Sequence, residues 1–457
     1  MDKDVRIAQL EAEVAELKRL LDAALEHIAR LSRTSRTSSK PPSSDIIKPP
    51  ASKPSTEDKR RGKQDDKTPP RKAGGQPGHD KHTRQPFTSE QIDQRFEYQW
   101  QDAGNDWLPM DDFYVVQQVE LPEKPLVVTE HRFRRYRHRL TGQIINAPVP
   151  ESLRRQGLLG PRLRAMTAWL KGQCHVSYRP LQAFYRDVLG LNVSTGQLAK
   201  VVRQCSEALT QPYDRLSAKL PEQAVVHVDE TGHREHCHRR WLWCAVGDGL
   251  TVFQVAAGRG ADVLESLLGK DYEGIIGSDF FSAYRRFVRE HGALASYCWA
   301  HLIREIRYLT TLRDKVLLNW GNKLLDEVRP LFSAWHAQDV PAQEQARDAI
   351  IRRVRRPPPR SQAQLLAQRI VDYQDAYFRF VGDTRVEPTN NKAERALRHA
   401  VIDRRITQGT RGDTGSRWLE RFLTIRETCR QREQSLFTCL HQAISQHTSG
   451  QKVAVLA

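Results

Sequence analysis

The sequence lacks the features that mark a membrane protein or a secreted one. No stretch approaches the run of about 18 apolar residues that a membrane-spanning helix needs, and the opening residues, MDKDVRIAQLEAE, are too charged for a secretory signal. None of the seven cysteines forms a CxxC pair, so reduced and mostly structural thiols are expected. We therefore expect a cytoplasmic protein with no membrane partner.

Acidic residues are the minority among the charged ones. The 457 residues include 72 Lys and Arg against 55 Asp and Glu, which gives a net charge of +17, and the basic residues are spread over the whole length. A chain of this length suffices for about two to four domains. Its charge favours a polyanion as partner, and nucleic acid is the first expectation.

A heptad repeat occupies residues 1 to 32. Apolar residues fill both seam positions, with Ile7, Val14, Leu21 and Ile28 at one and Leu10, Leu17, Ala24 and Leu31 at the other. Mostly β-branched residues at the first position with mostly Leu at the second favour a parallel two-stranded coiled coil. We expect a homodimer or higher oligomer held by this helix, although a single amphipathic helix packed on the body gives the same pattern.

Two segments without long helices follow. Residues 33 to 88 are rich in Pro, Ser, Gly and Lys and are expected to be disordered in isolation; their basic excess favours an arm that follows DNA phosphates over a plain spacer. Residues 89 to 150 alternate apolar and polar residues, which predicts a small β module with an apolar core. Its RRYRHRL stretch suits nucleic acid, but a solvated strand face has the same composition.

Residues 151 to 220 have helical periodicity, and LQAFYRDVLGLNVSTGQLAKVVRQC within them resembles a helix-turn-helix. Gly190 is expected to end the first helix and Ser194 to cap a second one that runs through residue 202. Gln197, Lys200 and Arg203 would then be exposed on the second helix, where they could contact DNA. An ordinary helical hairpin gives the same pattern, so the reading of bases stays open.

Residues 221 to 301 predict the first part of an α/β core. Three strands, a helix, a strand, a helix and a fifth strand follow one another, which is the order expected of an RNase H-like fold. In such a core the first and fourth strands lie side by side, so Asp229 and Asp279, each at a strand end, would reach the same cation. Either residue alone could be an ordinary turn or cap residue, but carboxylates brought together call for a divalent metal ion.

A third carboxylate is expected from beyond a helical insertion. Residues 302 to 385 are long, Arg-rich helical sequence that splits the core, and residues 386 to 457 supply a further core helix and a helical tail. The fold class is therefore multidomain α+β, with an RNase H-like core preceded by the coiled coil, the basic linker, the β module and the helical DNA-binding region.

The stretch EPTNNKAERALR opens that last segment. Pro388 disfavours helix before it, and Thr389 or Asn390 can cap a helix that holds Glu394 in its first turns. One face of this helix carries Asn390, Asn391, Glu394 and Arg398 by i, i+3 and i+4 spacing. Asn391 and Arg398 are therefore candidates to orient Glu394 or to touch phosphate, and Glu394 would complete a two-metal site for phosphoryl transfer.

Six ordered motifs make the chain resemble transposases of the IS sixty-six insertion-sequence type, part of the DDE superfamily. Behind the heptad helix they are SSKPPSSD, GGQPGH, HVDETGH, SDFFSAY, CWAHLIRE and TNNKAERALR, which span nearly the whole chain. The resemblance implies that Asp229, Asp279 and Glu394 are the catalytic triad and hold two Mg²⁺ or Mn²⁺ ions.

The resemblance also bears on the remaining Cys and His residues. It implies a supporting role, rather than metal ligation, for Cys298, His301 and Arg304. Many relatives carry paired cysteines for zinc near residues 89 to 150, but none occurs here before Cys174, so zinc is not expected there. A dense cluster of possible ligands consists of His233, His236, Cys237 and His238. It lacks a second ligand pair at suitable spacing, and basic histidines near DNA phosphates explain it better.

The combined expectation is a nucleoid-associated bacterial transposase. It would bind the terminal repeats of its element and target DNA, nick strands and join them, with accessory transposition proteins as possible partners implied by the resemblance. Two alternatives stay open. One is a non-catalytic dimeric DNA-binding regulator that uses the coiled coil, the arm and the helix-turn-helix; the other is an RNase H-like nuclease without strand transfer.

Overall fold

The computed structural model describes most of the chain from residue 85 onward: residues 85–98, 111, 113–150, 153–154 and 157–456, with 13–14 and 16–17 near the N-terminus. The chain divides into two units, Met1–Pro49 with Arg132–Ala457, and Pro50–His131. The heptad repeat and the basic linker lie almost wholly outside the described residues, so the coiled coil and the arm stay predictions. No helix among the described residues is long and apolar enough to cross a bilayer.

The stretch expected to form a β module contains little regular structure. A short 3₁₀ helix, η2, spans Ser89–Gln91 in the smaller unit. In the larger unit the strands β1 (Arg135–Arg137) and β2 (Ile144–Asn146) form an antiparallel hairpin whose six residues are all exposed. Large apolar side chains of residues 113 to 128 are exposed as well, so the described part of this stretch has no apolar core, contrary to expectation. Strands of three residues are too short to bury one face.

The region after residue 157 is helical, as the periodicity predicts. It contains α4 (Pro161–Gly172), α5 (Tyr178–Asp187), α6 (Thr195–Ala208) and α7 (Thr210–Ala218). Gly190 has a φ of +66° between α5 and α6, a conformation that glycine adopts without strain. The hydroxyl of Ser194 caps α6 by accepting a hydrogen bond from the Gln197 N–H, 3.1 Å away. The second helix therefore begins where expected but runs six residues past residue 202.

A five-stranded mixed sheet forms the α/β part, in the order β5-β4-β3-β6-β7. The strands are β3 (Val225–Glu235), β4 (His238–Val246), β5 (Thr251–Ala256), β6 (Ile275–Ser278) and β7 (Leu294–Tyr297). β3 pairs antiparallel with β4 and parallel with β6. The expected neighbourhood of the first and fourth strands of this segment is thus confirmed. The two helices α8 (Ala261–Leu268) and α9 (Ser282–His291) connect β5 to β6 and β6 to β7.

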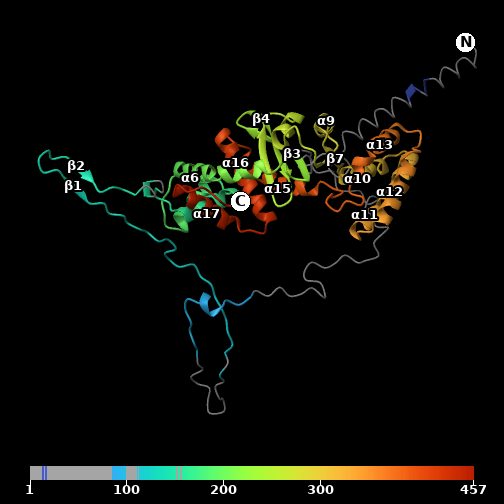
Figure 1. Ribbon diagram of the computed structural model, residues 1–457. Coiled ribbons are helices and arrows are strands. Elements are labelled where there is room, and N and C mark those ends of the chain that lie inside the picture. The colour runs from blue at the N-terminus through green and yellow to red at the C-terminus, as the bar shows by residue number, and fades with distance from the viewer. Residues whose placement is uncertain are drawn as a thin grey trace, which may run out of the picture. The chain divides into compact units, whose positions relative to one another are not determined.

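The segment between β7 and residue 385 is helical, as its sequence predicts, and it has a core of its own. Its helices are α10 (Trp299–Thr310), α11 (Lys315–His336), α12 (Val340–Val354), α13 (Ser361–Asp372) and α14 (Gln374–Tyr377). Fully buried side chains such as Trp299, Leu324 and Ile350 fill the core, which continues into β7 through Tyr297. Figure 1 shows these helices, in gold and orange, on the β7 side of the sheet.

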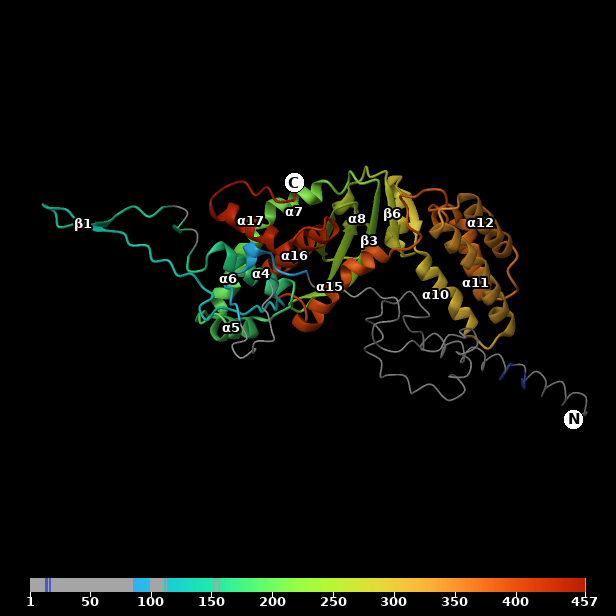
Figure 2. The ribbon, with the colours of Figure 1, turned by 90° about the horizontal axis from the view of Figure 1, so that it is seen from below.

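The C-terminal helices return to the sheet. They are α15 (Asn391–Thr407), α16 (Asp413–Gln431) and α17 (Leu436–Thr448), and Figure 2 shows α15 beside β3. α16 covers the edge strand β5, whose Val255, Phe253 and Thr251 N–H groups donate to side-chain oxygens of α16 at 2.7, 3.0 and 3.1 Å. The acceptors are Glu420, Thr424 and Thr428.

The match between α16 and β5 is geometrical. Four helical residues advance about 6 Å and two strand residues about 6.6 Å, so acceptors four apart meet every second N–H of the strand. An edge that would otherwise present unpaired donors is thereby closed to other strands.

Candidate active site

Asp229 and Asp279 occupy matching places on neighbouring strands. The parallel ladder between β3 and β6 ends with His227 opposite Gly277, and each aspartate lies two residues beyond its own member of that pair. The His227 ring lies so close over Gly277 that a Cβ at residue 277 would be 2.5 Å from its Nδ1 atom. Glycine at this position therefore lets the two strands approach where their aspartates follow.

The environment of Asp229 differs from the expectation in one respect. The strand was expected to end at Asp229, but β3 continues to Glu235 because it stays paired with β4 in a hairpin. Asp229 thus lies just past the parallel part of the ladder rather than at the strand's end. Its carboxylate accepts a hydrogen bond of 2.9 Å from the N–H of Glu230, while Asp279 accepts one of 2.9 Å from the N–H of Phe281.

The carboxylates of this region influence one another electrostatically. Burial, and then the charges of Glu230, Asp279 and Glu394, raise the pKa of Asp229 well above its ordinary value. Burial and the charge of Glu230 raise the pKa of Asp279 to about 6, although the Phe281 N–H and Arg259 oppose the shift. Partly desolvated carboxylates with excess negative charge are the donor set that a hard divalent cation stabilises.

Glu394 lies in the first turn of α15, as expected, and faces helix α10. Its carboxylate lies 3.4 Å from the Arg304 guanidinium and 3.8 Å from Nε2 of His301. Within the described residues, two groups of side chains bring their ligand atoms within 4.8 Å of one another: Cys298, His301 and Glu394, and Glu265, Glu290 and His291. The charge of Glu394 raises the pKa of Asp229 and that of Asp279. These three residues are nevertheless not one of the two groups whose ligand atoms lie this close together.

Asn390 fixes the start of α15 against the sheet. Its side chain is buried, donates to the Val228 carbonyl at 2.8 Å and lies 3.2 Å from His227 Nδ1. Its backbone N–H donates to the Cys298 sulfur at 3.1 Å. The residue that precedes Asp229 is therefore tied directly to the helix that carries Glu394, a link that the sequence alone did not reveal.

The neighbouring candidates on α15 have a different setting. Asn391 and Arg398 are exposed, and among the described residues neither forms a hydrogen bond or an ion pair with Glu394, whose partners are on α10. The adjacent pair of asparagines was the available signal, but helical spacing alone did not show which of the two turns inward.

A second network surrounds Glu230, the residue after Asp229. Its side chain is only 1% exposed, forms an ion pair with Arg259 and accepts a hydrogen bond from the Tyr284 hydroxyl. The Arg259 guanidinium in turn lies over the Phe281 ring at 3.8 Å. The network joins β3 to the segment that follows Asp279. The local signal for it is the second acidic residue of HVDETGH, which follows Asp229 directly and therefore faces the opposite side of the strand.

The other candidate residues lie as follows. Cys298 caps α10 and is buried, which raises the pKa of its thiol to about 11. Burial and Arg304 lower the pKa of His301 to about 3, so the ring is neutral. Gln197, Lys200 and Arg203 lie on α6, where the last two are exposed.

The histidine cluster forms the turn of the β3–β4 hairpin. His236 and Cys237 are its two turn residues, and His236 adopts a φ of +54°. His233 is buried with Nε2 at 3.1 Å from the Thr410 hydroxyl, whereas His238 is exposed. These residues are not one of the metal-ligand groups found among the described residues.

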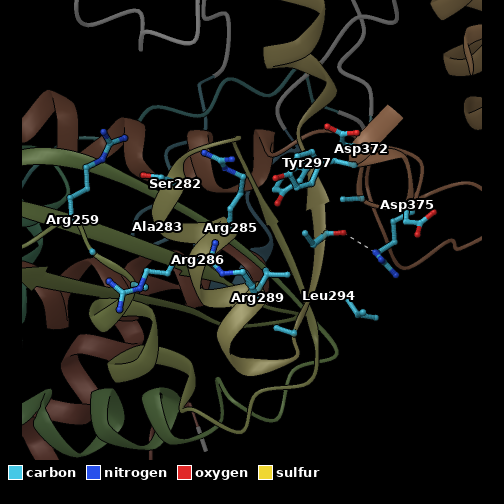
Figure 3. A pocket seen from close by; sticks show the side chains of 18 residues that line it. Arg259, Ser282, Ala283, Arg285, Arg286, Arg289, Leu294, Tyr297, Asp372 and Asp375 are labelled. Atoms are coloured by element: carbon cyan, nitrogen blue, oxygen red, sulfur yellow. Dashed lines mark hydrogen bonds between the residues drawn. The ribbon is translucent and has the colours of Figure 1, made fainter. Parts of the chain in front are cut away.

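An arginine-lined cavity of about 690 Å³ adjoins this region, between α9, β7 and the segment around α14. Figure 3 shows Arg285, Arg286 and Arg289 together on α9, with Asp372 and Asp375 on the opposite wall. Arg259 lines the cavity and also pairs with Glu230, so the cavity extends toward the carboxylates. Five arginines against two aspartates line it, which gives it the charge to accept phosphate groups.

The chain has a net charge of +17 and gathers carboxylates beside two parallel strands. It is therefore a basic protein with oxygen donors of the kind that hard divalent cations prefer. Residues 156–417 match the model of the family described as "Transposase IS66 family". The chain belongs to this transposase family, and the resemblance drawn from the six motifs is confirmed. Residues 1–85 match a second model, described as a family of unknown function (DUF6444).

A curated relative aligns with the greater part of the chain. The chain is 24% identical over 371 residues to "Uncharacterized protein y4qI" of Sinorhizobium fredii (strain NBRC 101917 / NGR234), and the alignment covers 72% of this chain and 67% of the relative. The family assignment places the protein among the transposases of insertion sequences, which act in DNA transposition and recombination. DNA is accordingly its partner, and divalent metal ions are the cofactors that such enzymes generally use.

Proposed function

We propose that the protein binds the terminal repeats of an insertion sequence and target DNA, and that Asp229, Asp279 and Glu394 carry DNA nicking and strand transfer. The observation that carries this proposal is the matching placement of the two aspartates, two residues beyond one pair of the β3–β6 ladder. The strand order supports an RNase H-like core, because three antiparallel strands are followed by two strands parallel to the first.

The three carboxylates would hold two Mg²⁺ or Mn²⁺ ions. The chemistry supplied by such ions is activation of the attacking oxygen and stabilisation of the leaving one. Asp229 and Asp279 offer hard oxygen donors, and burial together with the charges of neighbouring carboxylates raises the pKa of both. Asn390 holds the α15 terminus against the strand that bears Asp229, so it sets where Glu394 can reach.

Several surfaces would hold the DNA. The arginine-lined cavity lies beside Arg259 and so extends from the carboxylates along α9, a suitable course for a phosphate backbone. The exposed Lys200 and Arg203 on α6 are a second candidate surface, which would contact the repeats. Residues 33 to 88 would follow phosphates, and the heptad helix would join two copies of the chain, so that two element ends are held together.

The experiment is a cleavage assay on the ends of the element itself. Labelled duplex ends are incubated with the full chain and Mg²⁺ or Mn²⁺, and the products are separated by length. We expect nicks at the element boundary and, with target DNA present, joined products. Binding without nicks would instead support a non-catalytic dimeric regulator. Nicks without joined products would support a nuclease without strand transfer.

A further inference from the structure

A second set of metal donors lies next to the proposed triad and shares one residue with it. The Cys298 sulfur, a ring nitrogen of His301 and a carboxylate oxygen of Glu394 all lie within 4.8 Å of one another. Cys298 caps α10 and His301 follows three residues later, so one face of the helix presents both. Glu394 reaches them from α15.

The chemistry of this set differs from that of the aspartates. Sulfur and imidazole nitrogen are ligands for Zn²⁺ and similar transition metals, whereas Mg²⁺ takes oxygen donors almost alone. Three protein ligands with an open fourth position are also a common arrangement for tetrahedral zinc. The set is therefore suited to a thiophilic ion rather than to the ions of the proposed reaction.

Two features of the structure favour metal ligation by the Cys298 sulfur and the His301 imidazole. The backbone N–H of Asn390 donates a hydrogen bond of 3.1 Å to the Cys298 sulfur, and Cys298 stands at the N-terminus of α10. Donors of this kind stabilise a thiolate at the N-terminus of a helix. His301 Nδ1 is buried and has no hydrogen-bond partner among the described residues, while Nε2 faces Glu394 at 3.8 Å. A buried ring nitrogen without a partner is an unusual feature that ligation would explain.

We propose that Cys298, His301 and Glu394 bind Zn²⁺, and that the bound ion withdraws Glu394 from Asp229 and Asp279. Binding converts the Cys298 thiol to a thiolate and releases its proton to solvent. The Arg304 guanidinium, now 3.4 Å from Glu394, gives up one carboxylate oxygen to the ion. Zinc would then act as an inhibitor of the strand chemistry, and this second part rests on the proposed function.

The metal site can be tested without any DNA substrate. Co²⁺ is added to the metal-free full chain, because tetrahedral Co²⁺ bound to a thiolate has a characteristic charge-transfer absorption. We expect about one equivalent to bind with this band, and Zn²⁺ to remove it. Cys298→Ser should abolish the band, and His301→Gln should weaken Co²⁺ affinity by at least about 100-fold. The control is Cys237→Ser in the β3–β4 turn, which should leave the band intact.

Two results would overturn the site. If no thiolate band forms, Cys298 binds no metal ion. If the band survives Cys298→Ser and is lost in Cys237→Ser, the ion is held by the hairpin turn. Serine keeps an acceptor for the Asn390 N–H, and circular dichroism of each variant checks that the fold is retained.

Inhibition by Zn²⁺ is measured as the ratio of the cleavage rate with zinc to the rate without it. Mg²⁺-dependent cleavage of element ends is followed as Zn²⁺ is raised, and each variant is compared with its own zinc-free rate. We expect wild-type cleavage to fall as the site fills and the Cys298→Ser variant to resist. Equal inhibition of both would overturn the link between the two sites. If the wild type shows no Mg²⁺-dependent cleavage at all, the proposed function fails, while the Co²⁺ spectrum still decides the metal site.

Discussion

Asp229 and Asp279 each follow, by two residues, one member of the His227–Gly277 pair that ends the β3–β6 ladder. Side chains two apart on a strand leave the same face, so Asp229 is on the His227 face of β3, while Asp279 directly follows the last residue of β6. Burial and the neighbouring carboxylates raise the pKa of both. The close approach depends on Gly277, over which the His227 ring lies. This relationship would give the proposed metal site a structural origin in strand register.

In the metal-free protein, ionisation of Asp279 should destabilise the fold. Its pKa is raised from 3.8 to about 6, so the native state holds the proton more tightly than the unfolded chain. The free energy of unfolding therefore falls as pH rises from about 4 to 6 and stays lower above that window. We expect Asp279→Asn to raise it by about 3 kcal/mol near pH 8 and by much less near pH 4.

Urea unfolding in EDTA at the two pH values measures this effect. Asp248→Asn, at an exposed turn between β4 and β5, is the matched control and should change little at either pH. If the stability of Asp279→Asn keeps a constant offset from wild type over the whole range, the charge of Asp279 is not the cause.

Asn390 should position Glu394 as well as support the fold. Removal of its side chain leaves the Val228 carbonyl and His227 Nδ1 without their partner in a buried place. We expect Asn390→Ala to lower the free energy of unfolding by about 2 to 3 kcal/mol, and to depress cleavage far more than DNA binding. Asn391→Ala, one residue further and exposed, should change stability by less than about 0.5 kcal/mol.

The comparison is made by denaturant unfolding together with cleavage and binding of the same DNA. Asn390→Asp is a useful third variant, since it keeps an acceptor for His227 but loses the donor to Val228. An Asn390→Ala variant that cleaves at the wild-type rate would show that this anchor does not position Glu394.

The arginine-lined cavity should contribute sequence-independent DNA affinity. Arg285 and Arg289 line it, and removal of their charges leaves fewer cations to neutralise phosphates. We expect the double change to Gln to weaken binding of any duplex by about 10-fold at moderate salt, and to reduce the salt slope by about one unit for each phosphate that is no longer neutralised. The control is Arg329→Gln on α11, an arginine that is 79% exposed and outside the cavity. Fluorescence anisotropy over a salt series gives both values, and an unchanged slope would exclude DNA from the cavity.

α16 should protect the sheet edge through its side-chain acceptors. Thr424→Val keeps the shape of the side chain but leaves the Phe253 N–H unpaired. We expect a loss of about 1 to 3 kcal/mol in the free energy of unfolding. Thr414→Val, exposed on the same helix, is the control. Equal effects of both changes would mean that the hydrogen bond to β5 contributes nothing measurable.

Local sequence signals carried much of this architecture. The order of strands and helices, the place of both aspartates and the helical insertion follow from hydrophobic period and turn residues, which act over short distances. The place of Glu394 in the first turn of a helix was predicted in the same way, since Pro388 and the polar residues after it mark a helix start. The alternation within residues 113 to 128 led to the wrong prediction of an apolar core. Alternation produces a buried strand face only where another element covers that face, and here the large apolar side chains are exposed.

The remaining contacts join residues far apart in the chain. The Asn390 bond to Val228 spans 162 residues, and the Glu230 contact with Tyr284 spans 54. No local period encodes such pairs, because they arise only when the sheet, the insertion and α15 pack together. The same holds for Glu394, whose contacts with Arg304 and His301 depend on how α10 meets α15.

The most direct test of the central claim compares amide variants of the three carboxylates in one cleavage assay. Asp229→Asn, Asp279→Asn and Glu394→Gln are assayed on labelled element ends with Mg²⁺, alongside Glu387→Gln as the matched control. Glu387 is seven residues before Glu394 and pairs with Lys392 at 3.0 Å. We predict that each triad variant binds the ends with nearly wild-type affinity and gives no nicks, while Glu387→Gln nicks normally. Nicking by Glu394→Gln at the wild-type rate would contradict the account.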